Sequence, residues 1–84
     1  STDLRRLDLS ANSIATTLLL PPLASSLCSL SLASNLLAFI PTVDFFPVSL
    51  RHLDVSSNQL RIFSPDVFLQ RSPGIELVYH DNSQ

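Results

Sequence analysis

Leucines and asparagines recur along this chain at a nearly constant spacing. The pattern L-x-x-L-x-L-x-x-N-x-L, with Ile or Val at two of its apolar positions, covers residues 4–14, 27–37 and 50–60. Its central apolar positions alternate with polar ones. This period of two predicts short strands whose leucines all point to one side.

Each phrase has an asparagine two residues before its last apolar position, and a fourth asparagine follows in the degenerate last unit, so that the asparagines stand 23, 23 and 24 residues apart. We expect their amides to face inward and to bond the backbone of the adjacent repeat, because an unpaired buried amide costs about 1–3 kcal/mol. The predicted structural ladder consists of Asn12, Asn35, Asn58 and Asn82.

The segments between the phrases return the chain to the start of the next strand. Prolines at positions 21, 22, 41, 47, 65 and 73 argue against long helices there. We therefore expect extended, 3₁₀ or single-turn structure in the returns, with one helical turn at residues 66–70. The fourth unit is degenerate, since Gly74 and Gln84 replace two of the repeated apolar residues. Such drift is typical of a terminal repeat.

The repeated apolar positions and the apolar residues of the returns define the expected core. Its predicted members are Leu4, Leu7, Leu9, Ile14, Leu27, Leu30, Leu32, Leu37, Ile40, Leu50, Leu53, Val55, Leu60, Phe63, Phe68 and Leu77.

Apolar residues exceed what this core needs, at 45% of the chain with a mean hydropathy of +0.31. Leu36 and Phe39 stand at positions expected to face outward, and residues 18–20 and 45–46 are more than one return can bury. Irregular core packing is one interpretation. The other is a flank that lies against another domain or subunit, because monomers seldom expose large apolar patches.

The three phrases resemble the leucine-rich repeat, which has the same order of leucines and asparagine. The resemblance covers the whole chain as one uncapped segment, with repeats at 4–26, 27–49 and 50–73 and a partial repeat at 74–84. The repeat length and the phenylalanine in the return are similar to the typical class, which Toll-like receptors, small proteoglycans and many intracellular members share. The missing caps indicate a fragment of a longer repeat domain.

The resemblance implies an α/β solenoid, a right-handed superhelix with a short parallel sheet on its concave face and irregular or 3₁₀ convex returns. In the family, the side chains between the inward leucines form the usual ligand face. The candidate protein-binding residues are therefore Arg6, Asp8, Ser10, Ser29, Ser31, His52, Asp54, Ser56, Glu76 and His80.

Charge and cysteine content exclude several other classes of partner. Charged residues make up 14% of the chain and the net charge is −2, so nucleic acid is not an expected partner. The longest apolar stretch, residues 18–24, is far shorter than the roughly 20 residues that span a bilayer, so no direct membrane insertion is expected. The single cysteine, the missing sequon and the missing signal peptide favour an intracellular context.

Ser31, His52 and Asp54 are the residue types of a hydrolytic triad. An open sheet face collects such side chains by simple alternation, however, and provides neither a pocket nor oxyanion donors. His80 beside Asp81 lacks the further ligands that a metal ion needs. We therefore expect no enzymatic activity, no metal and no cofactor.

The leading prediction is a non-enzymatic module that binds a protein partner through the concave face. One alternative is a structural scaffold segment within a larger intracellular assembly, in contact through its apolar flank. A second alternative is a fragment of a cell-surface receptor ectodomain.

Overall fold

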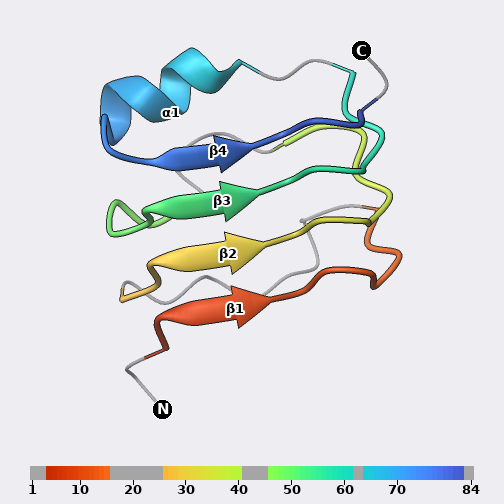
Figure 1. Cartoon of the computed structure of the whole chain (residues 1–84), viewed down its shortest axis with the longest axis horizontal. Coiled ribbons are helices and arrows are strands. Elements are labelled where there is room, and N and C mark those ends of the chain that lie inside the picture. The colour runs from red at the N-terminus through yellow and green to blue at the C-terminus, as the bar shows by residue number, and fades with distance from the viewer. Residues whose placement is uncertain (1–3, 16–25, 41–45, 62–63, 83–84) are drawn as a thin grey trace.

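Four short parallel strands form one sheet in chain order (Figure 1). The computed structural model describes residues 4–15, 26–40, 46–61 and 64–82. The strands are β1 (Arg6–Asp8), β2 (Ser29–Ser31), β3 (His52–Asp54) and β4 (Glu76–Val78). All four run in the same direction because each return carries the chain back before the next strand begins, as parallel neighbours require. The predicted four-stranded parallel sheet is confirmed.

The repeat spacing determines the register of the sheet. Leu7 pairs with Leu30, Leu30 with Leu53, and Leu53 with Leu77. This register places the leucines on one side of the sheet and the polar residues on the other. Leu30 and Leu53 are fully buried, whereas Leu7 and Leu77 in the two edge strands are partly buried.

The core lies on the leucine side of the sheet and confirms most of the predicted positions. Leu9, Ile14 and Ile40 are partly buried against it, and Phe63 lies outside the described residues. The prediction for Leu4 was wrong: its side chain is 40% exposed, since no described strand pairs along the outer edge of β1. The buried residues are Leu27, Leu30, Leu32, Leu37, Phe46, Leu50, Leu53, Val55, Leu60, Phe68 and Ile75.

Ile75 was not expected in the core, because the repeat places Gly74 at the position of Leu50. In the structure Gly74 is exposed and Ile75 is buried. The N–H of Ile75 bonds the carbonyl of Ser72, as the N–H of Leu50 bonds that of Pro47. The degenerate repeat thus fills its core with the residue after the glycine, because glycine has no side chain to bury.

The return of the third repeat contains the helix α1 (Pro65–Arg71). Pro65 suits the first turn, where its missing N–H removes no helical bond. Asp66 in the first turn and Arg71 in the last turn both favour the helix dipole. Phe68 is the residue of the helix that is buried in the core. One helical turn was predicted here over 66–70, and the observed helix extends it by one residue at each end. The 3₁₀ structure expected for the returns is not confirmed among the described residues.

Phe46 and Phe68 join the second and third returns. Their rings meet edge to face, with centroids 5.4 Å apart and planes at 61°. The guanidinium of Arg71 donates a 2.7 Å hydrogen bond to the carbonyl of Phe46. Phe46 is buried, so for this residue the structure favours the first interpretation of the apolar excess, which is irregular core packing. Phe45 and residues 18–20 lie outside the described residues.

The asparagine ladder is present at Asn35, Asn58 and Asn82, whereas Asn12 is exposed and its amide donates, among the described residues, only to Ser10 in its own turn. Asn35 Oδ1 accepts from the N–H groups of Asn12 and Ile14, each at 2.9 Å, and Asn35 Nδ2 donates to Leu9 in the preceding repeat. Asn58 bonds Leu37 in the same way. At the strand starts, two serines make a second ladder that sequence reasoning missed, although the repeated Ser-Leu dipeptide signals it. Ser26 donates to Leu4 at 2.8 Å and Ser49 to Leu27 at 2.6 Å.

The residue before each ladder asparagine has a left-handed backbone. The φ angles are 58°, 57°, 55° and 58°. None of these residues is glycine, although this region favours glycine. The strained position is therefore a repeated feature of the turn that aims the asparagine inward. Its members are Ala11, Ser34, Ser57 and Asp81.

Candidate functional site

Seven of the ten predicted contact residues lie in two rows across the sheet, and Ser10, Ser56 and His80 lie past the strand ends. In the first row Arg6 pairs with Ser29, Ser29 with His52 and His52 with Glu76; the second row comprises Asp8, Ser31, Asp54 and Val78. These rows share one side of the sheet because they alternate with the buried leucines along each strand. We call the eight residues of the two rows the polar sheet face.

A hollow of about 490 Å³ lies over the polar sheet face. It is the place where the structure brings most of the predicted residues together. Its lining comprises Arg6, Leu7, Asp8, Ser29, Ser31, His52 and Asp54.

Two carboxylates on this face are oriented by serines two residues later. Ser10 donates to Asp8 Oδ1 from its hydroxyl at 2.6 Å and from its backbone N–H at 3.0 Å. Ser56 repeats both bonds to Asp54 with the same distances. Each pair is a local turn in which an aspartate bonds the backbone two residues on. The hydroxyl of Ser10, followed by its N–H, holds the pKa of the Asp8 carboxyl below its ordinary value of 3.8, because both bonds favour the charged form.

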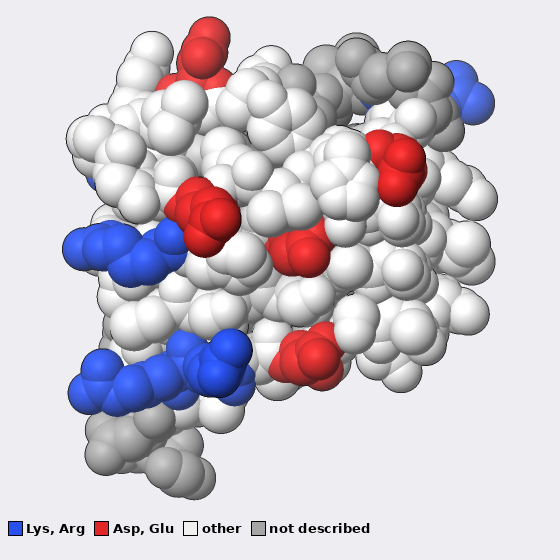
Figure 2. All heavy atoms as spheres, viewed as in Figure 1, with Lys and Arg blue, Asp and Glu red and all other residues white. Residues whose placement is uncertain are grey.

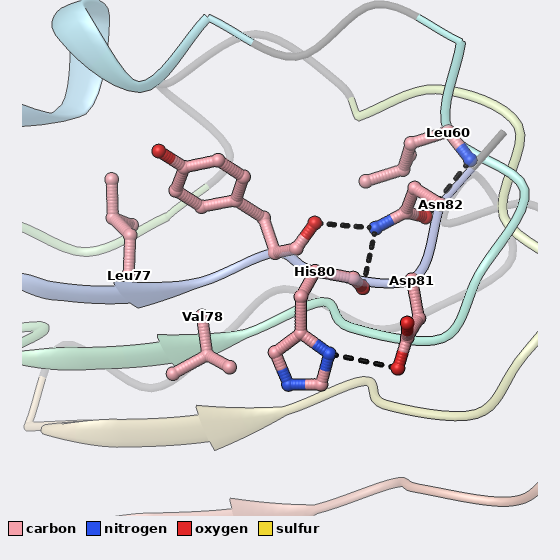
Figure 3. Close-up of a pocket in the computed structure, with 7 residues that line it drawn as sticks. Leu60, Leu77, Val78, His80, Asp81 and Asn82 are labelled. Carbon is pink, nitrogen blue, oxygen red and sulfur yellow. Dashed lines mark hydrogen bonds and ion pairs between the residues drawn. The ribbon is translucent and has the colours of Figure 1, made fainter. Parts of the chain in front are cut away.

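Ser56 and His80 were expected among the contact residues, and the structure gives each a different place. Ser56 is only 6% exposed, so it orients Asp54 and offers little surface to a partner. His80 lies past the end of β4 and pairs with Asp81, with 2.9 Å between Nδ1 and Oδ2. It lines a second hollow beside β4, whose lining includes only Val78 from the polar sheet face (Figure 3).

The contacts of His52 and Asp54 bear on the catalytic interpretation. His52 Nδ1 lies 3.2 Å from Glu76 Oε1, whereas the Asp54 carboxylate accepts its bonds from Ser56. A triad would instead need the histidine to be oriented by the aspartate and aimed at Ser31. These hydrogen bonds therefore hold His52 and Asp54 in two separate pairs, His52 with Glu76 and Asp54 with Ser56.

The charges of the face are separated along the strand direction. Figure 2 shows basic side chains over the strand starts and acidic side chains toward the strand ends. Arg6 begins β1, and Asp8 and Asp54 end β1 and β3. Glu76, at the start of β4, is the exception. On this face the acidic groups Asp8 and Asp54 thus lie about two residues, or roughly 7 Å, further along the strand direction than the basic Arg6.

Comparison with known proteins identifies the repeated unit. The model of the leucine-rich repeat family matches residues 3–27 and 49–70, together more than half of the chain. The chain belongs to the leucine-rich repeat family. The second repeat lies between the two matched ranges, and its register with both neighbours shows the same unit in three dimensions. No curated protein and no solved structure matches the chain significantly.

Leucine-rich repeats typically serve as non-enzymatic modules that bind proteins. Within the described ranges, no three His, Cys, Asp or Glu side chains are grouped closely enough to hold a metal ion. In the same part of the chain, no helix has the length and apolar character needed to cross a membrane. Cys28 is a free thiol, partly buried, whose sulfur lies 3.5 Å from the carbonyl of Ser26.

Proposed function

We propose that the polar sheet face binds a protein partner through charged and polar contacts of both signs. The observation that carries this proposal is the hollow whose lining includes six of the ten residues expected to bind. The Asp8 and Asp54 carboxylates are held by their serines before any partner arrives. Preorganised groups lose less conformational entropy on binding, so they contribute more of their interaction energy.

The positions of the charges indicate the chemistry of the partner. A complementary surface would place basic groups over Asp8 and Asp54 and an acidic group over Arg6. Such an arrangement fixes the orientation of the partner and disfavours partners with reversed charge. Its affinity would fall at high salt, because the contacts lie near solvent.

The test uses peptides selected from a random displayed library on the 84-residue chain, with amide NMR shifts to map where they bind. We expect shifts that cluster on β1, β2 and β3, and loss of binding when Asp8 and Asp54 are both changed to alanine. The matched control changes the exposed Asp66 and Gln70 of α1 to alanine and should leave binding intact. Selected peptides that bind elsewhere and tolerate the double aspartate variant would overturn the proposal.

A second candidate function is a scaffold segment that contacts a larger assembly through an apolar flank. The observation that favours it is the exposure of Phe39 at 70%, Val48 at 63% and Leu36 at 45%. In the same NMR experiment, this function predicts amide shifts at these three residues. Peptide binding should then be unchanged when Asp8 and Asp54 are replaced by alanine.

A further inference from the structure

We infer that the partner of the polar sheet face contributes an extended segment that lies along β2, with an acidic side chain over Ser29 and an arginine over Ser31. The inference rests on the function proposed above and specifies what occupies the hollow. The shape of the hollow, its spacing along the strand and the order of its charges carry it.

The hollow over the polar sheet face is centred on β2, and its lining reaches from β1 to β3. β2 contributes two serines, the smallest side chains of the lining, and longer side chains of β1 and β3 lie on either side. β2 is paired with a strand on each side, so this shape does not depend on either end of the sheet. We call it the serine trench; its floor is Ser29 and Ser31, and its walls are Arg6, Asp8, His52 and Asp54.

The width of the serine trench suits an extended chain. Neighbouring strands lie about 4.8 Å apart, so the backbones of β1 and β3 are roughly 10 Å apart. An α-helix measures about 10–12 Å across with its side chains, so it is too wide to enter between the walls. An extended segment is narrower, and only every second side chain of it points toward the floor.

The spacing along the trench matches that of an extended segment. Ser29 and Ser31 are two residues apart in one strand, which is about 6.6 Å. An extended partner places its alternate side chains at the same interval. Two successive inward side chains can therefore lie over the two serines, whose hydroxyls both donate and accept hydrogen bonds.

At the level of Ser29 the trench favours an acidic side chain. Arg6 pairs with Ser29 in the sheet register and supplies a positive charge on the β1 wall. On the β3 wall, His52 Nδ1 lies 3.2 Å from Glu76 Oε1, so this ring is held toward β4. An acidic group of the partner at this level would pair with the Arg6 guanidinium.

At the level of Ser31 the trench favours an arginine. The carboxylates of Asp8 and Asp54 line the two walls there. Ser10 and Ser56 bond Oδ1 of each carboxylate and orient it. An ionised carboxylate offers about four acceptor sites, so both can accept further bonds. The planar guanidinium has five donors and suits two carboxylates better than the compact ammonium of lysine does.

The two levels predict a sequence signature in the partner, which is opposite charges two residues apart. The acidic residue comes first if the segment runs parallel to β2, and the arginine comes first if it runs antiparallel. The order of the charges therefore determines the direction in which the segment lies.

Short peptides test the spacing. Each has five residues, with threonine outside the charged positions to favour an extended chain, and is titrated into the 84-residue chain while amide NMR shifts are followed. Peptides with Glu-Thr-Arg or Arg-Thr-Glu at their centre should shift amides of β1, β2 and β3. Peptides with adjacent Glu and Arg, or with two glutamates, should bind about fivefold more weakly, the factor expected for the loss of one exposed ion pair.

Direction is the sharper measurement. A nitroxide on the amino terminus of each peptide broadens the amide signals near it. With Glu-Thr-Arg the label should broaden the signal of Cys28, just before β2, and with Arg-Thr-Glu it should broaden that of Ala33, just after it. This reversal needs no variant of the chain, and general attraction between charges would not produce it.

A matched pair of variants tests the trench itself. Ser29→Tyr places a ring on the floor at a strand position that tyrosine suits, and it should abolish the shifts. Gln59→Tyr adds the same side chain at an exposed position outside the trench and should leave binding unchanged. The amide spectrum of each variant without peptide reports whether the sheet is intact.

Three results would overturn the extended segment: affinity that does not depend on charge spacing, a label position that does not follow charge order, or peptides that shift no amide of β1 to β3. The function proposed above would survive them if library-selected peptides still bind the polar sheet face and lose binding in the double aspartate variant. The two proposals therefore fail separately.

Discussion

The side-chain amide of Asn58 donates a hydrogen bond to the carbonyl of Leu32, 2.9 Å away and 26 positions earlier in the chain. The same nitrogen also donates to Val55 and Ser56 at 3.0 Å each. One buried amide thus closes its own turn and holds the preceding repeat. The repeats are tied by these polar contacts as well as by the leucines that they bury together.

The ladder predicts a graded response to the loss of its asparagines. Asn35→Ala should lower the free energy of unfolding by about 1–3 kcal/mol, because it leaves buried backbone groups of two repeats unpaired. Asn12→Ala should cost much less, since Asn12 is exposed. Ser34→Ala is the neighbouring control, expected within about 0.5 kcal/mol. Urea unfolding followed by circular dichroism gives the values, and equal midpoints for N35A and S34A would remove the ladder argument.

The left-handed turns predict an unusual pattern of tolerance. Ser57 has a φ of 55° and is exposed. Glycine adopts this conformation freely, whereas a β-branched residue does so at a cost of about 1–2 kcal/mol or more. Ser57→Gly should therefore leave stability unchanged or raise it, and Ser57→Val should lower it.

The matched control for the valine variant is Ser29→Val in β2, where a β-branched side chain suits the strand. Thermal unfolding of the three variants measures the contrast. A Ser57→Val chain as stable as the Ser29→Val chain would mean that the left-handed turn carries no strain.

The repeated phrase made much of the fold predictable, because alternation of leucine with polar residues specifies both the strand and its buried side. Leu7, Leu30, Leu53 and Leu77 were therefore placed correctly in one row. The same alternation placed the polar sheet face.

Features outside the alternation were harder to predict. The choice of Ile75 over Gly74 depends on where the turn from Ser72 ends, which the repeat pattern does not encode. Leu4 fits the phrase as well as Leu27 does, and its exposure follows from its place at the sheet edge. On the face, the position of Ser56 in the repeat predicted it as a contact, but its hydroxyl donates to Asp54 inside the molecule.

The ring contact between Phe46 and Phe68 predicts a large loss of stability on truncation. Phe46→Ala should cost about 3–5 kcal/mol, because it removes a buried aromatic ring and leaves a cavity. A chain of this length has roughly 4–13 kcal/mol in total, so the variant should be close to unfolding. Phe39→Ala removes the same side chain from an exposed position and should cost little.

The pair is also expected to be coupled. In a double-mutant cycle with Phe46→Leu and Phe68→Leu, edge-to-face contact predicts a coupling energy of about 0.5–1.5 kcal/mol. Leucine keeps most of the apolar volume, so all four chains should remain folded for urea titration. Additive losses within error would show that the two rings stabilise the returns independently.

The serine bonds of Asp8 predict a measurable effect of pH. Because the folded pKa lies below 3.8, the ionised carboxyl stabilises the native turn above that pH, and the contribution is lost as pH falls through the lowered value. Ser10→Ala removes the hydroxyl, which is the largest cause, and should move the Asp8 pKa upward toward 3.8 while the backbone bond keeps part of the shift. NMR titration of the Asp8 carboxyl carbon gives the value directly. Ser57→Ala, two repeats away, is the matched control and should leave the titration unchanged. An Asp8 pKa that is equal in the wild-type and S10A chains would show that the hydroxyl does not hold the carboxylate in solution.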